Sequence, residues 1–166
     1  MRPALPFPLL TIGNRLHGQG KPGGPAIDYV SDAADFSTLS VHDVRLGTQV
    51  GKILIGRDGR CWEILSVTDR GIGSPWKIWW ILGLFFGFLH WVEYELAELD
   101  PLSLEQVKDR VVALIRESPE DWGFEEGHEP VEGTLDDFIG RIRETPDLIQ
   151  LINELFYEHL VGEDER

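Results

Sequence analysis

The side chains that could perform catalysis are scattered in this sequence. The five histidines, at positions 17, 42, 90, 128 and 159, show no spacing that pairs two imidazoles. There is no G-x-S-x-G, no phosphate-binding loop, no G-x-G-x-x-G behind a predicted strand and no H-E-x-x-H. Carboxylates are abundant, so an enzyme that uses a carboxylate pair stays an alternative. The absence of a catalytic pattern leads us to expect a protein without enzyme activity.

Metal and thiol chemistry are equally weakly supported. Glu125, Glu126 and His128 are neighbours in a Gly-rich segment, where no i, i+4 helical spacing brings their side chains together on one metal. Cys61 is the only cysteine, which excludes an internal disulfide framework and any site with several thiolates. We expect Cys61 to be a small strand residue in a protein of a reducing compartment, the cytoplasm. No cofactor is expected.

Charge is distributed very unevenly along the chain. Residues 1–90 carry 9 Lys and Arg against 7 Asp and Glu, whereas residues 91–166 carry 6 against 22. The net charge of −14 therefore comes from the C-terminal part. A region of one sign steers association with cationic surfaces and is repelled by phosphate. The charge predicts a protein partner with a basic surface and disfavours nucleic acid.

Size and composition predict one α+β domain preceded by an arm. A chain of 166 residues with 42% hydrophobic residues can bury one ordinary core. Six Trp, eight Phe and three Tyr are too much aromatic surface to leave in water. Residues 1–25 are rich in proline and glycine and show no cleavage-site pattern, so we expect a flexible arm and no signal peptide. The folded domain is predicted over residues 26–166.

The strand signals lie between residues 26 and 97. Residues 52–55 and 61–67 favour strands, and Asp58-Gly59 between them is typical of a hairpin turn because glycine supplies a positive φ. From residue 88 the apolar pattern has a period of two. It places His90, Val92 and Tyr94 on an inner face and Trp91, Glu93 and Glu95 on an outer face. We expect about four antiparallel strands.

The aromatic segment at residues 76–92 leaves several interpretations open. Its uninterrupted apolar run spans residues 78–89, and these twelve residues fall short of the roughly 20 that a membrane-spanning helix needs. Gly83 and Gly87 form G-x-x-x-G, a helix-contact pattern only in longer apolar segments. We expect a buried helix or turn that leads into a core strand. A subunit contact and an interfacial membrane segment are the alternatives, so the oligomeric state stays open.

Helices are predicted in the C-terminal part. Ser103 and Gln106 form a capping box, Thr134 is typical of an N-cap, and Pro146 is tolerated at a first helical position. Apolar residues then recur at helical spacing. The predicted helices, packed on one face of the sheet, cover residues 103–117, 134–143 and 146–160.

An acidic segment at residues 117–133 connects the first two of these helices. It holds seven acids, no Lys or Arg, and the aromatics Trp122 and Phe124. One interpretation is a solvated loop that its two aromatics attach to the body of the protein. The other is a recognition loop, because loops on a rigid scaffold often carry function.

Four features follow one another in the middle of the chain: an Asp-Gly hairpin at residues 58–63 (DGRCWE), the aromatic segment, the strand 91–96 (WVEYEL) and the helix start 103–108 (SLEQVK). This order, over about residues 50–117, resembles the small acidic immunity proteins of bacterial polymorphic-toxin and contact-dependent inhibition systems. The resemblance implies a non-enzymatic cytoplasmic inhibitor that binds a toxin domain, often a basic nuclease.

These observations predict a protein that binds and blocks a cationic partner, with acidic side chains in place of the phosphates of the partner's substrate. Interfaces concentrate binding energy in a few aromatic residues, so a tryptophan is the expected anchor. The alternative class is an assembly subunit that oligomerises through its aromatic segment. The predicted partner-binding residues are Trp91, Glu93, Glu95, Glu120, Asp121, Trp122, Glu125, Glu126, Asp136 and Asp137.

Overall fold

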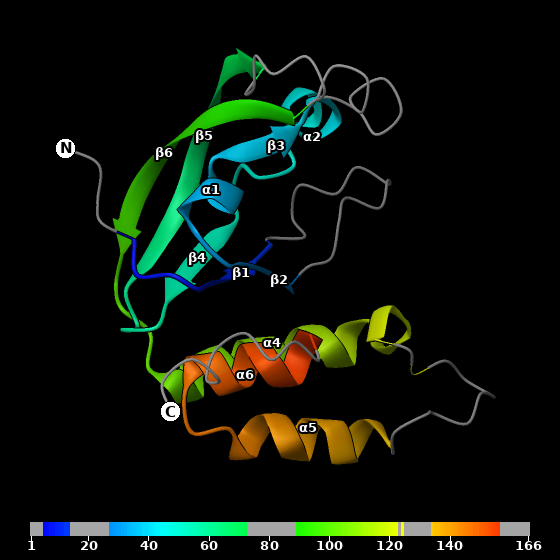
Figure 1. Cartoon of the computed structure of the whole chain (residues 1–166). Coiled ribbons are helices and arrows are strands. Elements are labelled where there is room, and N and C mark those ends of the chain that lie inside the picture. Colours follow the sequence, from blue (N-terminus) through cyan, green and yellow to red (C-terminus); the bar gives the residue numbers. More distant parts are fainter. Residues whose placement is uncertain (1–4, 14–26, 73–88, 123, 125–133, 157–166) are drawn as a thin grey trace, which may run out of the picture.

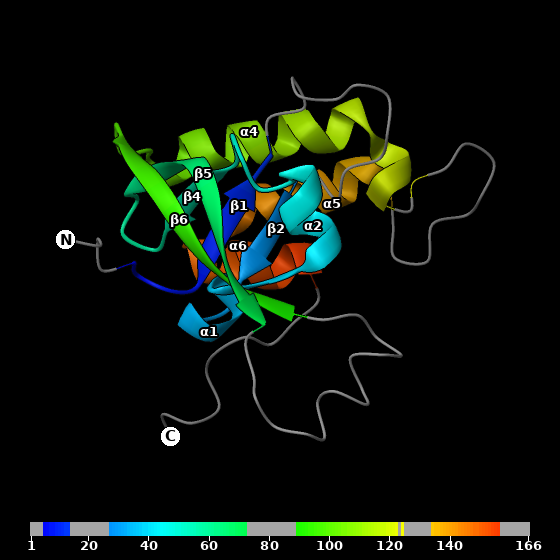
Figure 2. The ribbon, with the colours of Figure 1, turned by 90° about the horizontal axis from the view of Figure 1, so that it is seen from above.

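The protein is an antiparallel sheet with a layer of helices against one face (Figures 1 and 2). The computed structural model describes residues 5–13, 27–72, 89–122, 124 and 134–156. This part of the chain forms a curled six-stranded sheet, so the α+β class is confirmed and the expected four strands are approximately right. The strand order is β2-β1-β4-β5-β6-β3, with the bounds Leu9–Ile12 (β1), Ile27–Val30 (β2), Thr38–Ser40 (β3), Ile53–Gly56 (β4), Cys61–Ile72 (β5) and Leu89–Leu99 (β6).

Strand β1 is an interior strand, whereas the sequence predicts a flexible arm over residues 1–25. All four residues of β1 are buried, and it pairs with β2 on one side and with β4 on the other. The arm prediction is therefore wrong for β1, and the fold uses residues before position 26. A strand that is buried on both faces shows an apolar run without alternation. Pro6 and Pro8 beside such a short run favour a loop interpretation.

The predicted Asp-Gly hairpin is present as β4 and β5. Gly59 has a φ of +79°, and its N–H donates to the carbonyl oxygen of Gly56 at 2.9 Å. The Gly59 carbonyl in turn accepts the N–H of Leu102 at 3.0 Å. The turn is thereby attached to the connection between β6 and the helix layer.

The helices predicted in the C-terminal part are present, although one starts later than expected. Helices α4 and α5 begin after Ser103 and Thr134, and each has the hydrogen bonds of a capping box. Helix α6 begins at Leu148 and not at Pro146, because the Asp147 carboxylate accepts the N–H of Gln150 at 2.8 Å. The helical bounds are Ala33–Phe36 (α1), Val41–Leu46 (α2), Leu104–Glu117 (α4), Leu135–Glu144 (α5) and Leu148–Phe156 (α6), with a 3-10 helix at Pro119–Trp122 (η2).

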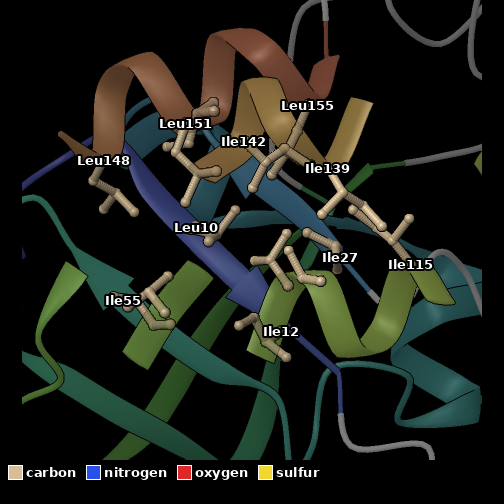
Figure 3. Packing of buried hydrophobic residues seen from close by; sticks show 14 of the residues in the cluster. Leu10, Ile12, Ile27, Ile55, Ile115, Ile139, Ile142, Leu148, Leu151 and Leu155 are labelled. Carbon is tan, nitrogen blue, oxygen red and sulfur yellow. The ribbon is translucent and has the colours of Figure 1, made fainter. Parts of the chain in front are cut away.

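The larger hydrophobic core lies between the sheet and helices α4, α5 and α6 (Figure 3). Strands β1, β2 and β4 supply buried isoleucine and leucine side chains from one side, and the three helices supply the other side. The prediction that the helices pack on one face is confirmed. The residues labelled in the figure are Leu10, Ile12, Ile27, Ile55, Ile115, Ile139, Ile142, Leu148, Leu151 and Leu155.

A second, smaller core fills the opposite face of the sheet. Trp62 is its largest buried side chain, and the curled strands bring partly buried aromatics around it. Phe36 of α1 stacks on Tyr94 of β6 at 4.3 Å between ring centroids, and Phe7 contacts Phe36 edge-on at 6.1 Å. Strands β1 and β4 therefore contribute side chains to the larger core on one face and to the smaller core on the other.

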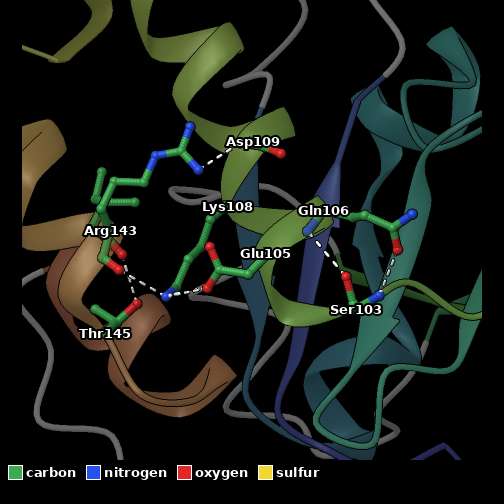
Figure 4. A network of polar contacts seen from close by, with 8 residues as sticks. Ser103, Glu105, Gln106, Lys108, Asp109, Arg143 and Thr145 are labelled. Atoms are coloured by element: carbon green, nitrogen blue, oxygen red, sulfur yellow. Dashed lines mark hydrogen bonds and ion pairs between the residues drawn. The ribbon is translucent and has the colours of Figure 1, made fainter.

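Polar links hold helices α4 and α5 together (Figure 4). The Lys108 ammonium donates to the Arg143 carbonyl oxygen at 2.9 Å and to a Glu105 carboxylate oxygen at 2.9 Å. At the surface, the Arg143 guanidinium pairs with Asp109 at 2.5 Å. A cation at the end of α5 is favourable because the last carbonyls of a helix lack intrahelical donors.

The predicted aromatic segment lies almost entirely outside the described residues, which resume at Leu89. Its interpretation as core, subunit contact or interfacial segment stays a prediction. Among the helices that the structure describes, none combines the length and the apolar character needed to span a membrane.

Candidate functional site

The predicted strand face is a part of the sheet that the helix layer leaves uncovered. Trp91, Glu93 and Glu95 lie on the same face of β6 as Leu99, which packs against the core beneath the helices. Strands β5 and β6 extend past that core, so this face continues without a helix over it (Figure 1). We call Trp91, Glu93 and Glu95 the β6 acidic face.

Strand β5 supplies partners to both carboxylates of the β6 acidic face. The Arg70 guanidinium forms an ion pair with Glu93, and the Ser66 hydroxyl donates to Glu95 at 2.9 Å. Two bulges in β5 produce these neighbours by shifting the register after Ile64 and again after Asp69. The face is thus less acidic than the sequence of β6 suggests, with Glu95 as its exposed carboxylate.

Apolar side chains extend the β6 acidic face toward β3. Trp91 is 43% exposed and Leu89 52% exposed, although both are large hydrophobic residues on a regular strand. They lie two residues apart and so point to the same side of the sheet. An exposed aromatic beside carboxylates is the composition of an interface centre with a polar rim.

The other predicted residues that the structure describes lie at the far end of the helix layer. Glu120 and Asp121 are exposed on η2, and Asp136 and Asp137 occupy the first turn of α5. Figure 1 shows η2 and the start of α5 at the same end of the layer, away from β6. We call these four the helix-end acids. Glu125 and Glu126 lie outside the described residues.

Asp137 already has a structural role within the helix-end acids. Its carboxylate accepts the Thr134 N–H at 2.9 Å and the Thr134 hydroxyl at 2.8 Å. These hydrogen bonds hold the pKa of Asp137 below its ordinary value, since they stabilise the charged form. Asp137 therefore caps α5, and exposed Asp136 is the freer of the two for contact with a partner.

Trp122 is committed to the protein's own core. Its ring lies 6.1 Å from that of Phe138 and 6.3 Å from that of Phe156, and Phe124 contacts Phe138 at 5.6 Å. The two aromatics attach the start of the acidic segment to α5 and α6, as the solvated-loop interpretation expects. Of the two candidate anchors, Trp91 is the one that presents its ring to solvent.

One pair of side chains has the chemistry of a proton-transfer site. His90 Nδ1 lies 2.8 Å from both carboxylate oxygens of Asp69, and the His90 side chain is 17% exposed. The Gly71 N–H and then His90 hold the pKa of Asp69 below its ordinary value. Within the described ranges no third His, Cys or carboxylate joins them in a metal-binding group. The contact accounts for His90 on the inner face as a hydrogen-bonded residue.

The remaining reactive groups are engaged in structure. Burial raises the pKa of the Cys61 thiol, which donates to the Gly59 carbonyl oxygen at 3.4 Å. A hollow between the β4–β5 turn and the starts of α4 and α6 is lined by Asp58, Ser103 and Asp147, among others. These three side chains bond Arg60, Gln106 and Gln150 respectively. Neither place offers a poised nucleophile.

The chain matches no family model, no curated protein and no solved structure. The sequence pattern places Leu89 on the outer face with Trp91, but Leu89 was not among the predicted partner-binding residues, and Arg70 was missed. The position of Arg70 beside Glu93 depends on the cross-strand register set by the β5 bulges, for which the sequence holds no signal beyond Gly71.

Proposed function

We propose that this protein is a non-enzymatic binding protein that neutralises a cationic protein partner, and that the partner is a bacterial toxin domain. The observation that supports this function best is an exposed tryptophan and leucine next to carboxylates, on a strand face that no described helix covers. The −14 net charge favours a basic partner. The order of elements shared with immunity proteins supports the toxin as the specific partner.

The β6 acidic face is the proposed centre of the contact, with the helix-end acids as a second acidic region. Trp91 is the anchor, because interfaces concentrate binding energy in aromatic residues surrounded by polar groups. Glu95 meets a basic side chain of the partner, since its neighbour Ser66 donates a hydrogen bond but carries no charge. Glu93 is a weaker contributor because Arg70 already neutralises it.

The test is inhibition of a defined partner. The candidate is the C-terminal domain of a large secreted protein encoded immediately upstream, co-expressed with this chain while growth is followed. Trp91→Ala and Glu95→Lys should each remove protection, since a lost anchor costs about 2 kcal/mol or more and a close charge pair couples by about 1.5–7 kcal/mol. Glu120→Lys with Asp121→Lys tests the helix-end acids separately.

The matched control is Glu144→Lys, a charge reversal of an exposed residue at the opposite end of α5 from Asp136. It changes the net charge by the same amount as Glu95→Lys and should leave protection intact. Association measured by stopped flow should slow as salt rises from about 50 to 500 mM, because screening shortens the reach of the field to several Å. An on-rate independent of salt, or equal effects of Glu95→Lys and Glu144→Lys, contradicts the proposal.

A further inference from the structure

Among the residues that the structure describes, no strand pairs with the outer edge of β6 along most of its length. Strand β3 pairs only with Leu89–Trp91, and the last bond on that side runs from the Val92 N–H to the Ser37 carbonyl oxygen at 2.9 Å. Backbone groups alternate sides along an antiparallel strand. Since Val92 points its N–H away from β5, Tyr94, Leu96 and Glu98 also point their N–H and C=O groups outward.

No hydrogen bond satisfies these outward groups within the described part of the chain. The pairing of β6 beyond Val92 is with β5 alone, and no loop or turn residue bonds the backbone of Tyr94, Leu96 or Glu98. Figure 1 shows this stretch of β6 along one side of the sheet. Natural edge strands are usually protected by charged side chains, above all lysine, by proline or by bulges. Strand β6 has neither lysine nor proline, and the register shifts of the β5–β6 pair lie on β5. Its charged residues are glutamates, which oppose another acidic strand but favour a basic one.

The side chains along this edge select the chemistry of an added strand. One face presents Glu95 and, paired with Arg70, Glu93. The other face presents Tyr94 and Leu96 at the margin of the smaller core, followed by the exposed Glu98. Strand β6 carries no Lys or Arg. An added strand would place alternate residues beside each face. It therefore requires a basic side chain beside Glu95 and apolar side chains beside Tyr94 and Leu96.

We propose that the β6 edge binds an extended basic segment of the partner by strand addition, with its backbone paired to Tyr94, Leu96 and Glu98. The inference rests on the proposed function, because it specifies how the cationic partner binds. A second copy of this chain is the less favourable occupant. It would bring the three β6 glutamates of each copy together between two molecules of charge −14.

The test follows amide hydrogen exchange of the full chain by NMR, with synthetic peptides as probes. One probe is the capped heptapeptide KVKVKVK, and its control is KVKPKVK, which has the same charge but cannot extend as a continuous strand. In the free chain the amides of Tyr94, Leu96 and Glu98 should exchange much faster than those of Glu95 and Ala97, which face β5. Saturating KVKVKVK should slow the three outward amides at least tenfold, and KVKPKVK should not.

A pair of variants tests the same edge from the side of the protein. Glu98→Pro removes one outward N–H, and Glu98→Ala removes the same charge but keeps the N–H. Proline is tolerated at an edge position whose N–H faces solvent, so both variants should unfold cooperatively. The Kd for KVKVKVK should rise about tenfold more in Glu98→Pro than in Glu98→Ala.

Three results would overturn strand addition. The first is protection of the outward amides in the free chain, including protection that grows with protein concentration, which indicates a second copy. The second is an equal Kd for the two Glu98 variants. The third is salt-dependent binding of both peptides without amide protection, which refutes strand addition but leaves a charge-driven partner intact. If instead neither the peptides nor the upstream-encoded domain binds at low salt, the proposed function itself fails.

Discussion

Replacement of Lys108 by methionine tests how the helix layer is held together. The Lys108 side chain is 4% exposed, yet its ammonium bonds the Arg143 carbonyl oxygen at the end of α5. Methionine keeps most of the aliphatic stem and removes only the donor and the charge. The change leaves a carbonyl at the end of α5 without its donor.

The expected cost is about 1–3 kcal/mol of unfolding free energy, the range for a buried polar group that loses its partner. Loss of the favourable interaction between the ammonium and the C-terminal end of α5 adds about 0.3–1 kcal/mol to this cost. The opposing effect is relief of the desolvation of a buried ammonium, whose carboxylate partner Glu105 is largely exposed. We expect the first effect to dominate, because the ammonium has two acceptors at 2.9 Å.

Urea denaturation followed by circular dichroism measures this cost, with an unchanged m-value as the sign of intact two-state folding. The matched control is Asp109→Ala, which breaks an exposed ion pair between the same two helices and should cost at most about 0.5–1 kcal/mol. A Lys108→Met protein as stable as the parent would refute the reasoning and show that desolvation outweighs the hydrogen bonds. Equal costs for the two variants would also contradict it.

Three further predictions concern the turn, the thiol and a helix cap. Gly59→Ala should lower the unfolding free energy more than Gly47→Ala in urea denaturation. Both glycines have a positive φ, which costs an alanine about 1–2 kcal/mol. A Cβ at Gly59 would also lie 2.8 Å from the Leu102 carbonyl oxygen, whereas a Cβ at Gly47 would meet no atom within 4 Å. Equal costs would contradict the close approach. Cys61 should react with a thiol reagent only when the protein unfolds, because burial raises its pKa and blocks access; rapid labelling of the native protein would argue against this. The stabilisation of α5 by the Asp137 cap should be fully present above about pH 4 and should be lost as the pH falls through the lowered pKa of Asp137, because protonation removes the charged acceptor. An NMR titration midpoint for Asp137 at or above about 3.9 would contradict this.

Local chemistry made several elements predictable. The Ser103 capping box, the Thr134 cap and the Asp-Gly turn each depend on residues within a few positions of one another, so the sequence carries the complete signal. The alternation along β6 was predictable for the same reason. It correctly placed Val92 inside and Trp91 outside.

Elements defined by distant partners were not predictable in the same way. Strand β1 is recognisable only from its neighbours β2 and β4, because its four buried residues, three apolar and one threonine, show no alternation. The ion pair of Arg70 with Glu93 depends on two β5 bulges that shift the cross-strand register. The sequence likewise left two interpretations for Trp122, and its contacts with Phe138 and Phe156 favour attachment to the core.

The sequence by itself determined the residues available for binding: an acidic C-terminal part, a strand with three glutamates, and the absence of a catalytic pattern. Only the tertiary structure decided which of them lie together. Pairing with β5 brings Arg70 beside Glu93 and Ser66 beside Glu95, while the helix-end acids lie at the far end of another layer (Figure 1). The open edge of β6 likewise follows from the shortness of β3, since a strand's free hydrogen-bonding groups depend on how far its neighbour extends.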